Sequence, residues 1–192
     1  MDINYMKRIE RYNKMASAPK NKSKEIINTL PIKKGDKILE IGAGGGYYAK
    51  IFSKIVGEKG NYYGIDTNKV FIENLNTIGK SGLKNITGIN TLPNEIPDLP
   101  KKVDFVFSRN VYHHLENRID YFRKISDIIT IKGKIIIIDY NEKLSLFRLS
   151  GHYTPKFLII KELGEAGFLV TQDLGLLNNQ SFLIFEKNKN RA

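Results

Sequence analysis

Short apolar runs alternate along this chain with segments whose apolar residues repeat at helical spacing. The runs have the length of strands, and the i, i+3, i+4 spacing between them is typical of amphipathic helices. We predict strands over the apolar runs 37–41, 61–65, 85–89, 103–107 and 134–139. We predict helices over the spaced segments 4–15, 23–30, 48–56, 71–78 (closed by Gly79 and Gly82), 122–129 and 155–166.

The repeated alternation of strand and helix predicts an α/β fold with a doubly wound sheet. The strands Val103–Phe107 and Lys134–Asp139 are almost continuously apolar, as parallel strands buried on both faces must be. Near the C-terminus, 168–174 and 181–187 flank Asn178-Asn179 and indicate an antiparallel hairpin. The expected architecture is a mostly parallel seven-stranded sheet that ends in this hairpin.

Two of the predicted helices carry signals at their ends. Ser23 belongs to the residue types that cap helices, and Pro31 ends the segment that follows it. Thr154 precedes Pro155, which predicts an N-cap followed by a proline at the first helical position.

The length of 192 residues suits one domain, 1–192, in which 1–30 forms an N-terminal helical cap. The chain has no cysteine, which excludes disulfides, thiolate metal sites and cysteine nucleophiles. Its charged beginning does not resemble a signal peptide, and no apolar run approaches the roughly 20 residues of a membrane helix. We therefore expect a cytoplasmic protein without a membrane span.

Basic residues are concentrated near the beginning of the chain. The formal net charge is +11, and residues 1–37 contain ten Lys or Arg against four acidic residues. This concentration indicates either a surface for nucleic acid or anionic lipid, or a solvated lysine-rich helix face. Lys outnumbers Arg by 24 to 7, which favours the solvated face, because nucleic-acid sites are usually richer in Arg.

The segment Glu40–Gly46 (EIGAGGG) joins a predicted strand to a predicted helix. Glycines there let a ligand approach the main chain, and the helix start offers N–H groups to an anionic group. Tyr47 stands where the dinucleotide pattern G-x-G-x-x-G needs a small residue. The Glu40 carboxylate would repel a pyrophosphate but attract an ammonium, so the loop suits a cationic amino-acid ligand better than a dinucleotide.

Asp66 ends the second predicted strand, 20 residues after Gly46. A carboxylate at this strand end typically accepts hydrogen bonds from the ribose hydroxyls of a bound nucleotide. The alternative is that Asp66 caps a helix or lies in a solvated turn.

These residues resemble those of the class I S-adenosylmethionine-dependent methyltransferases, particularly the small-molecule branch similar to quinone-biosynthesis enzymes. Glu40–Gly46 is similar to the motif E/D-x-G-x-G-x-G, and Asp66 to the ribose-binding acid. The segment 104–115 (DFVFSRNVYHHL) resembles the fourth-strand motif, and 122–139 resembles the helix, turn and strand after it. The likeness covers 20–187 and implies a Rossmann-like methyltransferase fold with S-adenosyl-L-methionine as cofactor.

The resemblance also implies which residues hold the cofactor. They are Glu40 at the amino-acid end, Gly42, Ala43, Gly44 and Gly46 in the loop, Asp66 and Thr67 at the ribose, and Ser108 and Arg109 beside the methionine part. After the third strand the family usually has an Asp that contacts adenine, and this chain has Asn90. Either the Asn90 amide oxygen accepts the same hydrogen bond, or Ile89 packs on the adenine and Asn90 caps the loop.

The methyl acceptor is expected beside the residues that follow the fourth strand, where Tyr112, His113 and His114 are the candidates for catalysis. Methyl transfer needs a general base only when the nucleophile arrives protonated, and a histidine has a suitable pKa. The alternative, a structural or shape-forming role on the turn after the strand, is favoured for these histidines. We expect no metal site formed by these histidines with His152 and Asp139, because histidines adjacent in sequence usually diverge.

The expected function is methyl transfer to a small-molecule acceptor. An RNA methyltransferase, suggested by the charge, and a nucleotide-binding oxidoreductase or non-catalytic binding domain on the same fold are alternatives. Nucleic acid is not the favoured partner, because the chain lacks an Asn-Pro-Pro-Tyr-like motif. The segment 141–157, in which Leu144, Leu146, Phe147 and Leu149 cluster, is either a substrate lid, ordinary packing or a dimer contact, and the oligomeric state is open.

Overall fold

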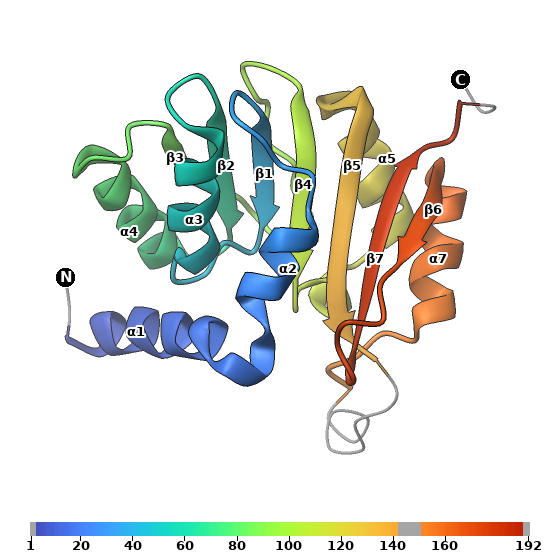
Figure 1. Cartoon of the computed structure of the whole chain (residues 1–192), viewed down its shortest axis with the longest axis horizontal. Helices are drawn as coiled ribbons and strands as arrows, with labels where there is room; N and C mark the ends of the chain where they lie inside the picture. Colours follow the sequence, from blue (N-terminus) through green and yellow to red (C-terminus); the bar gives the residue numbers. More distant parts are fainter. Residues whose placement is uncertain (1–2, 142–150, 190–192) are drawn as a thin grey trace. The chain divides into compact units, whose positions relative to one another are not determined.

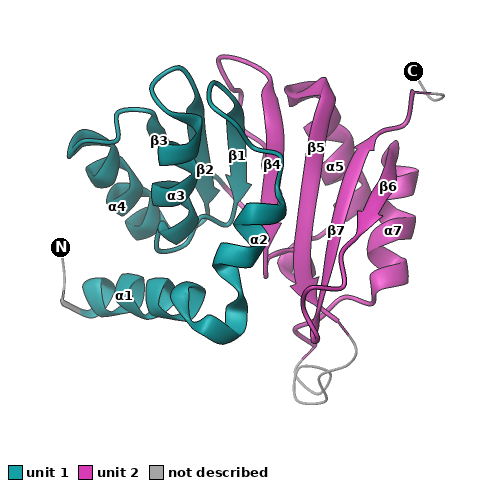
Figure 2. Cartoon of the chain, in the orientation of Figure 1, with its two compact units in different colours: residues 1–91 teal, residues 92–192 magenta. Residues whose placement is uncertain are grey.

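Two units make up the chain, residues 1–91 and residues 92–192 (Figure 2). The structure is a computed structural model that describes residues 3–141 and 151–189. The strand order is β3-β2-β1 in unit 1 and β4-β5-β7-β6 in unit 2. These are the two parts of the predicted seven-stranded sheet.

Unit 1 contains a parallel set of three strands with β2 in the middle (Figure 1). The ladder pairs Ile41 with Ile65 and Asp66 with Asn90. Because parallel strands end at the same edge, the polar residues after these strands gather there. The elements of unit 1 are α1 (Ile3–Ser17), η1 (Pro19–Asn21), α2 (Ser23–Thr29), β1 (Lys37–Ile41), α3 (Tyr47–Val56), β2 (Asn61–Asp66), α4 (Lys69–Lys80) and β3 (Ile86–Asn90).

The core of unit 1 forms where α3 and α4 pack on these strands. Phe52 of α3 and Leu75 of α4 are fully buried, as is Leu39 of β1. Burying a side chain of this size contributes about 1.5–3 kcal/mol to the free energy of unfolding. The alternation of apolar strands and amphipathic helices therefore anchors the carboxyl edge that carries the candidate site.

Unit 2 contains β4 and β5 in parallel and β7 antiparallel to both β5 and β6. Ile135, Ile136, Ile137 and Ile138 are 0% exposed, as a strand covered on both faces requires. The helices α5 and α7 lie on the same face of these strands (Figure 1). The elements are β4 (Val103–Arg109), η2 (Tyr112–His114), α5 (Arg118–Ile128), β5 (Ile129–Tyr140), α7 (Lys156–Glu165), β6 (Phe168–Asp173) and β7 (Gln180–Lys187).

The predicted fold class, a doubly wound and mostly parallel seven-stranded sheet with a C-terminal antiparallel hairpin, is confirmed. Several element boundaries differ from the prediction. Ile129 was expected in a helix, but it begins β5 and pairs with Val103. Gly79 was expected to close a helix, but α4 continues to Lys80. A Cβ at Gly79 would lie 2.8 Å from the Ile86 carbonyl oxygen, so the glycine lets the helix approach β3 closely.

Both predicted caps are wrong in detail. Lys22, not Ser23, is the N-cap of α2. The Ser23 hydroxyl instead donates to the Ala16 carbonyl at 2.6 Å and lies 2.9 Å from the Tyr48 hydroxyl, so tertiary contacts outweigh capping. Pro155 is itself the N-cap of α7 rather than its first residue. Within the described residues, the buried Thr154 hydroxyl has no hydrogen-bond partner.

In residues 3–141 and 151–189, no helix is both long and apolar enough to cross a membrane. The leucine-rich part of the predicted lid (Leu144, Leu146, Phe147 and Leu149) lies outside the described residues, so the lid stays a prediction.

Candidate functional site

The loop between β1 and α3 is shaped by its glycines. Gly42, Gly44 and Gly46 have φ values of 73°, 51° and 83°, which side chains with a Cβ rarely adopt. The N–H groups of Gly42 and Ala43 donate to the Ile65 carbonyl oxygen at 2.9 and 3.1 Å. The loop is therefore fastened to the end of β2, and its main chain stays open to a ligand.

Helix α1 lies directly against this loop. A Cβ built at Gly45 would be 2.6 Å from the Asn13 amide oxygen and 2.7 Å from the Ile9 carbonyl oxygen. At Gly44 the nearest side-chain atom is Cδ1 of Tyr12, at 3.9 Å from such a Cβ. Figure 1 shows α1 below the carboxyl ends of β1 and β2. That residues 1–30 act as a helical cap stays a prediction.

Asp66 stands at the carboxyl end of β2 and faces the same loop. Its carboxylate accepts hydrogen bonds from the N–H groups of Gly44 at 3.0 Å and Asn68 at 2.8 Å. Burial raises the pKa of Asp66, while these hydrogen bonds and the positive charge of Arg8 oppose the rise. The N–H of Thr67, which is exposed, also lowers that pKa.

Glu40 lies beneath the loop, 4% exposed, and accepts a hydrogen bond from the Tyr62 hydroxyl at 2.5 Å. Burial raises the pKa of Glu40 to about 8, and the negative charge of Asp66 adds to the rise. The group is therefore mostly protonated at neutral pH. Its predicted support of the amino-acid end stays a prediction.

Asn90 ends β3 beside Asp66. Its amide nitrogen donates to the Asp66 carbonyl oxygen at 2.9 Å. This hydrogen bond directs the side chain along the edge of the sheet and is compatible with both roles predicted for it.

In unit 2, the end of β4 carries the remaining predicted cofactor residues. Ser108 is 1% exposed, and its hydroxyl has no partner within the described residues. The Arg109 guanidinium donates to the Gln180 amide oxygen at 3.1 Å, and the Gln180 amide nitrogen donates to the side chain of Asn110. Asn110 adopts a φ of 58°, which turns the chain sharply after the strand.

A buried carboxylate organises the histidines of unit 2. Asp139 is 0% exposed and accepts hydrogen bonds from the His113 N–H at 2.8 Å and the Tyr140 N–H at 2.9 Å. Its Oδ1 lies 2.7 Å from Nδ1 of His113, whose side chain is 4% exposed. Because a carboxylate oxygen accepts the hydrogen bond, Nδ1 of His113 is the donor in this pair.

The other two histidines lie on the exposed side of His113. Their ring centroids are 4.0 Å (His114) and 5.7 Å (His152) from that of His113, and 5.5 Å from each other. Partial burial lowers the pKa of His114, and the charges of His113 and His152 lower it further. His114 is therefore a neutral imidazole at pH 7.

Tyr112, the third predicted catalytic residue, is fully buried. Its hydroxyl donates to the Glu162 carboxylate at 2.6 Å, and the Arg118 guanidinium lies 5.1 Å from the centre of its ring. Burial and Glu162 raise the pKa of Tyr112, so the hydroxyl keeps its proton. The hydroxyl thus helps to hold α7 in place, and the structure does not direct it to the histidines.

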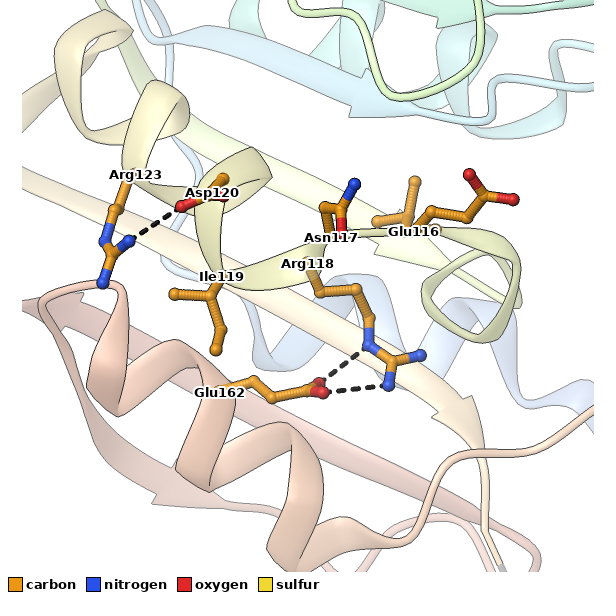
Figure 3. A pocket seen from close by; sticks show the side chains of 8 residues that line it. Glu116, Asn117, Arg118, Ile119, Asp120, Arg123 and Glu162 are labelled. Carbon is orange, nitrogen blue, oxygen red and sulfur yellow. Dashed lines mark hydrogen bonds and ion pairs between the residues drawn. The ribbon is translucent and has the colours of Figure 1, made fainter.

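An open pocket of about 460 Å³ lies around the start of α5 (Figure 3). Its charges pair with each other: Arg118 donates to both carboxylate oxygens of Glu162 at 2.8 and 2.9 Å, and Arg123 donates to Asp120 at 2.7 Å. None of its lining residues is a predicted site residue. The pocket therefore adds no chemistry to the site.

Unit 1 fits S-adenosylmethionine on the observed geometry. At Gly44 no heavy atom beyond the adjacent residues lies nearer than 3.9 Å to a Cβ built there, so the loop has room at this point, and the Asp66 carboxylate stands at the strand end beside it. The buried Asn13 amide oxygen next to the loop has no partner in the described chain. Across the residues that the structure describes, no three His, Cys, Asp or Glu side chains are placed to hold a metal ion.

The chain belongs to the class I S-adenosylmethionine-dependent methyltransferases, because the model of a family described as "Methyltransferase domain" matches residues 32–165. The predicted family, enzyme class and cofactor are therefore confirmed.

Among curated proteins, the chain is 38% identical over 71 residues to a protein-L-isoaspartate O-methyltransferase of Methanococcus aeolicus, covering 35% of this chain and 33% of that protein. It is 31% identical over 77 residues to the demethylmenaquinone methyltransferase of Staphylococcus carnosus, covering 40% of this chain and 30% of that protein. The chain thus spans about a third of the length of these relatives. Among solved structures, a SAM-dependent methyltransferase of Aquifex aeolicus shares the fold, with a TM-score of 0.82 over 93% of this chain and 96% of that chain at 22% identity.

Three residues at the site escaped the sequence reasoning. In the sequence, Asn13 is only a polar residue on a predicted helix, and nothing marks it as part of a site. Gln180 lies far along the chain from Arg109 and Asn110, the residues that it contacts. Asp139 was considered only as a member of a metal site that was not expected and as the end of a strand. Its position there was the available signal, because carboxylates at the ends of parallel strands often face ligands.

Proposed function

We propose that this domain transfers a methyl group from S-adenosylmethionine to a small-molecule acceptor whose nucleophilic atom carries a proton. The histidine cluster carries the proposal: Asp139 holds His113 from the interior, and His114 lies against His113 on the exposed side. The bound cofactor supplies an electrophilic methyl group. The chain's own residues then have to align the acceptor and remove its proton.

In this proposal His114 accepts the acceptor's proton. It is exposed and neutral at pH 7, as a general base must be. His113 is a positioning residue, because its Nδ1 is fixed by Asp139 and its ring supports that of His114. A proton arriving at His114 is favoured by the buried Asp139 charge, which is among the groups that act on the pKa of His114.

On the cofactor side, we assign the ribose hydroxyls to the Asp66 carboxylate. The loop from Gly42 to Gly46 surrounds the amino-acid end, and the start of α3 offers N–H groups to its carboxylate. Asn90 lies beside Asp66, where it reaches the adenine side of the same edge.

A small acceptor is favoured over RNA by the chemistry of the cluster. The cluster is made of the imidazole rings of His113, His114 and His152, whereas phosphate backbones are held by Lys and Arg. The cationic Arg109 nearby is engaged with Gln180. One of the two relatives is a protein-L-isoaspartate O-methyltransferase and the other a demethylmenaquinone methyltransferase, so similar proteins include one named for a small acceptor.

The test supplies the protein with labelled methyl donor and, in parallel, phenols, quinols, thiols, bulk tRNA and unfolded protein. We expect label in one class of small molecule and about a 100-fold lower rate in His114→Gln, within the range for loss of a general base. Arg123→Gln, on the exposed face of α5, should keep the full rate. If only tRNA or protein were labelled, the proposal of a small-molecule acceptor would be wrong. If His114→Gln kept the full rate, His114 would not be the general base.

A further inference from the structure

The inner face of α1 offers a polar group to the glycine loop. The Asn13 amide oxygen would lie 2.6 Å from a Cβ at Gly45, and Tyr12 is next to Gly44. One turn earlier, the Arg8 guanidinium lies 5.5 Å above the ring of Phe71 and lowers the pKa of Asp66. The helix thus runs from the glycine loop to the carboxylate that we assign to the ribose.

The Asn13 amide oxygen is buried and has no hydrogen-bond partner in the described part of the chain. A buried acceptor without a partner destabilises a protein, because it has lost its hydrogen bonds to water and has formed none within the protein. Native structures rarely contain buried polar atoms without a hydrogen-bond partner, except where a ligand or an ion supplies that partner. The position of this oxygen therefore points to a donor that arrives with the cofactor.

The cofactor offers one strong donor at its amino-acid end, the α-ammonium group. An amide oxygen accepts such a group well, whereas the cofactor's carboxylate would be repelled by it. The carboxylate has a different partner, because the N–H groups at the start of α3 favour anions. The ammonium group of the cofactor's amino-acid end is thus assigned to α1, and its carboxylate to the start of α3.

We propose that the Asn13 amide oxygen accepts a hydrogen bond from the α-ammonium group of the cofactor, which makes α1 part of the binding site. The proposal rests on the proposed use of S-adenosylmethionine as methyl donor. Among the described side chains of α1, only Ile9 is buried, so the helix is weakly anchored without the cofactor. Cofactor binding should then also protect the amides of α1 from hydrogen exchange.

The test compares two ligands by calorimetry: S-adenosylhomocysteine, which has the amino-acid end, and methylthioadenosine, which lacks it. Asn13→Leu keeps the size of the side chain and removes the acceptor, while Asn13→Asp keeps the acceptor. We expect Asn13→Leu to weaken S-adenosylhomocysteine roughly tenfold or more and methylthioadenosine less than twofold. Asn13→Asp should bind S-adenosylhomocysteine at least as well as the parent protein.

Met6→Ala, on the exposed side of α1, is the matched control and should change neither affinity. Equal losses for both ligands in Asn13→Leu would mean that Asn13 only supports the loop, and the proposal would be wrong. Unchanged binding of S-adenosylhomocysteine would also overturn it. If the parent protein bound neither ligand, the proposed function itself would fail, a result distinct from both.

Discussion

The candidate site of unit 1 is built from main-chain atoms, whereas that of unit 2 is built from ionisable side chains. In unit 1, glycines with positive φ expose the backbone at the end of β1, and few side chains take part. In unit 2, the buried Asp139 fixes His113, which in turn supports two exposed imidazoles. The cofactor is the same throughout the family, so main-chain atoms, which do not change with the sequence, can bind it. The acceptor varies, so it is contacted by side chains, which substitutions can change.

The largest expected effect tests the side-chain half of this comparison. Asp139→Asn keeps the size of the side chain but places an amide where two N–H groups and Nδ1 of His113 need an acceptor. The His113 tautomer is then no longer fixed. We expect the methyl-transfer rate to fall by about 10²- to 10⁴-fold. Calorimetry with S-adenosylhomocysteine should show unchanged affinity, and a parallel loss there would mean that the unit has unfolded.

Asp66→Ala tests the side chain of unit 1 that we assign to the ribose. The hydrogen bonds that its carboxylate would accept from the ribose are lost, so the affinity for S-adenosylhomocysteine should fall by about 1.5–3 kcal/mol. Calorimetry measures this directly. If Asp66→Ala bound the ligand as tightly as the parent protein, the ribose would have another partner.

Gly45→Ala tests the backbone half of the comparison. The added Cβ would overlap the Asn13 amide oxygen and the Ile9 carbonyl oxygen, so α1 must move away from the loop. We expect the free energy of unfolding to fall by about 1–3 kcal/mol. Gly164→Ala in α7, where nothing lies within 4 Å of the new Cβ, is the control and should stabilise the helix by about 0.5–1 kcal/mol. Similar shifts in both variants on denaturant melts would argue against the close approach.

Glu40→Gln should change how the stability of unit 1 depends on pH. Burial raises the pKa of Glu40 to about 8, so between pH 4.5 and 8 the folded protein keeps a proton that the unfolded chain loses. The free energy of unfolding then falls as pH rises, by up to ~1.4 kcal/mol per pH unit. Gln cannot ionise, so denaturant melts across this window should show a shallower slope. An unchanged slope would mean that another group titrates.

Much of unit 1 could be predicted from the sequence, because its features are local. The glycine loop, the acid 20 residues later and the strands on either side lie within one stretch whose spacing is set by the βαβ geometry. The helix ends were less predictable. Ser23 was expected to cap α2, but it bonds to Ala16 and Tyr48, which only the folded chain brings near.

The α/β class, the hairpin, the family and the place of the glycine loop could be inferred without a structure, because each follows from periodicity or from residues close together in the chain. The folded chain was needed to show which histidine is held and which is exposed, that the Tyr112 hydroxyl is directed to Glu162, and that Asn13 faces the loop. These contacts join residues 26 to 50 positions apart, or a helix to a loop, and their geometry depends on packing that no local pattern encodes.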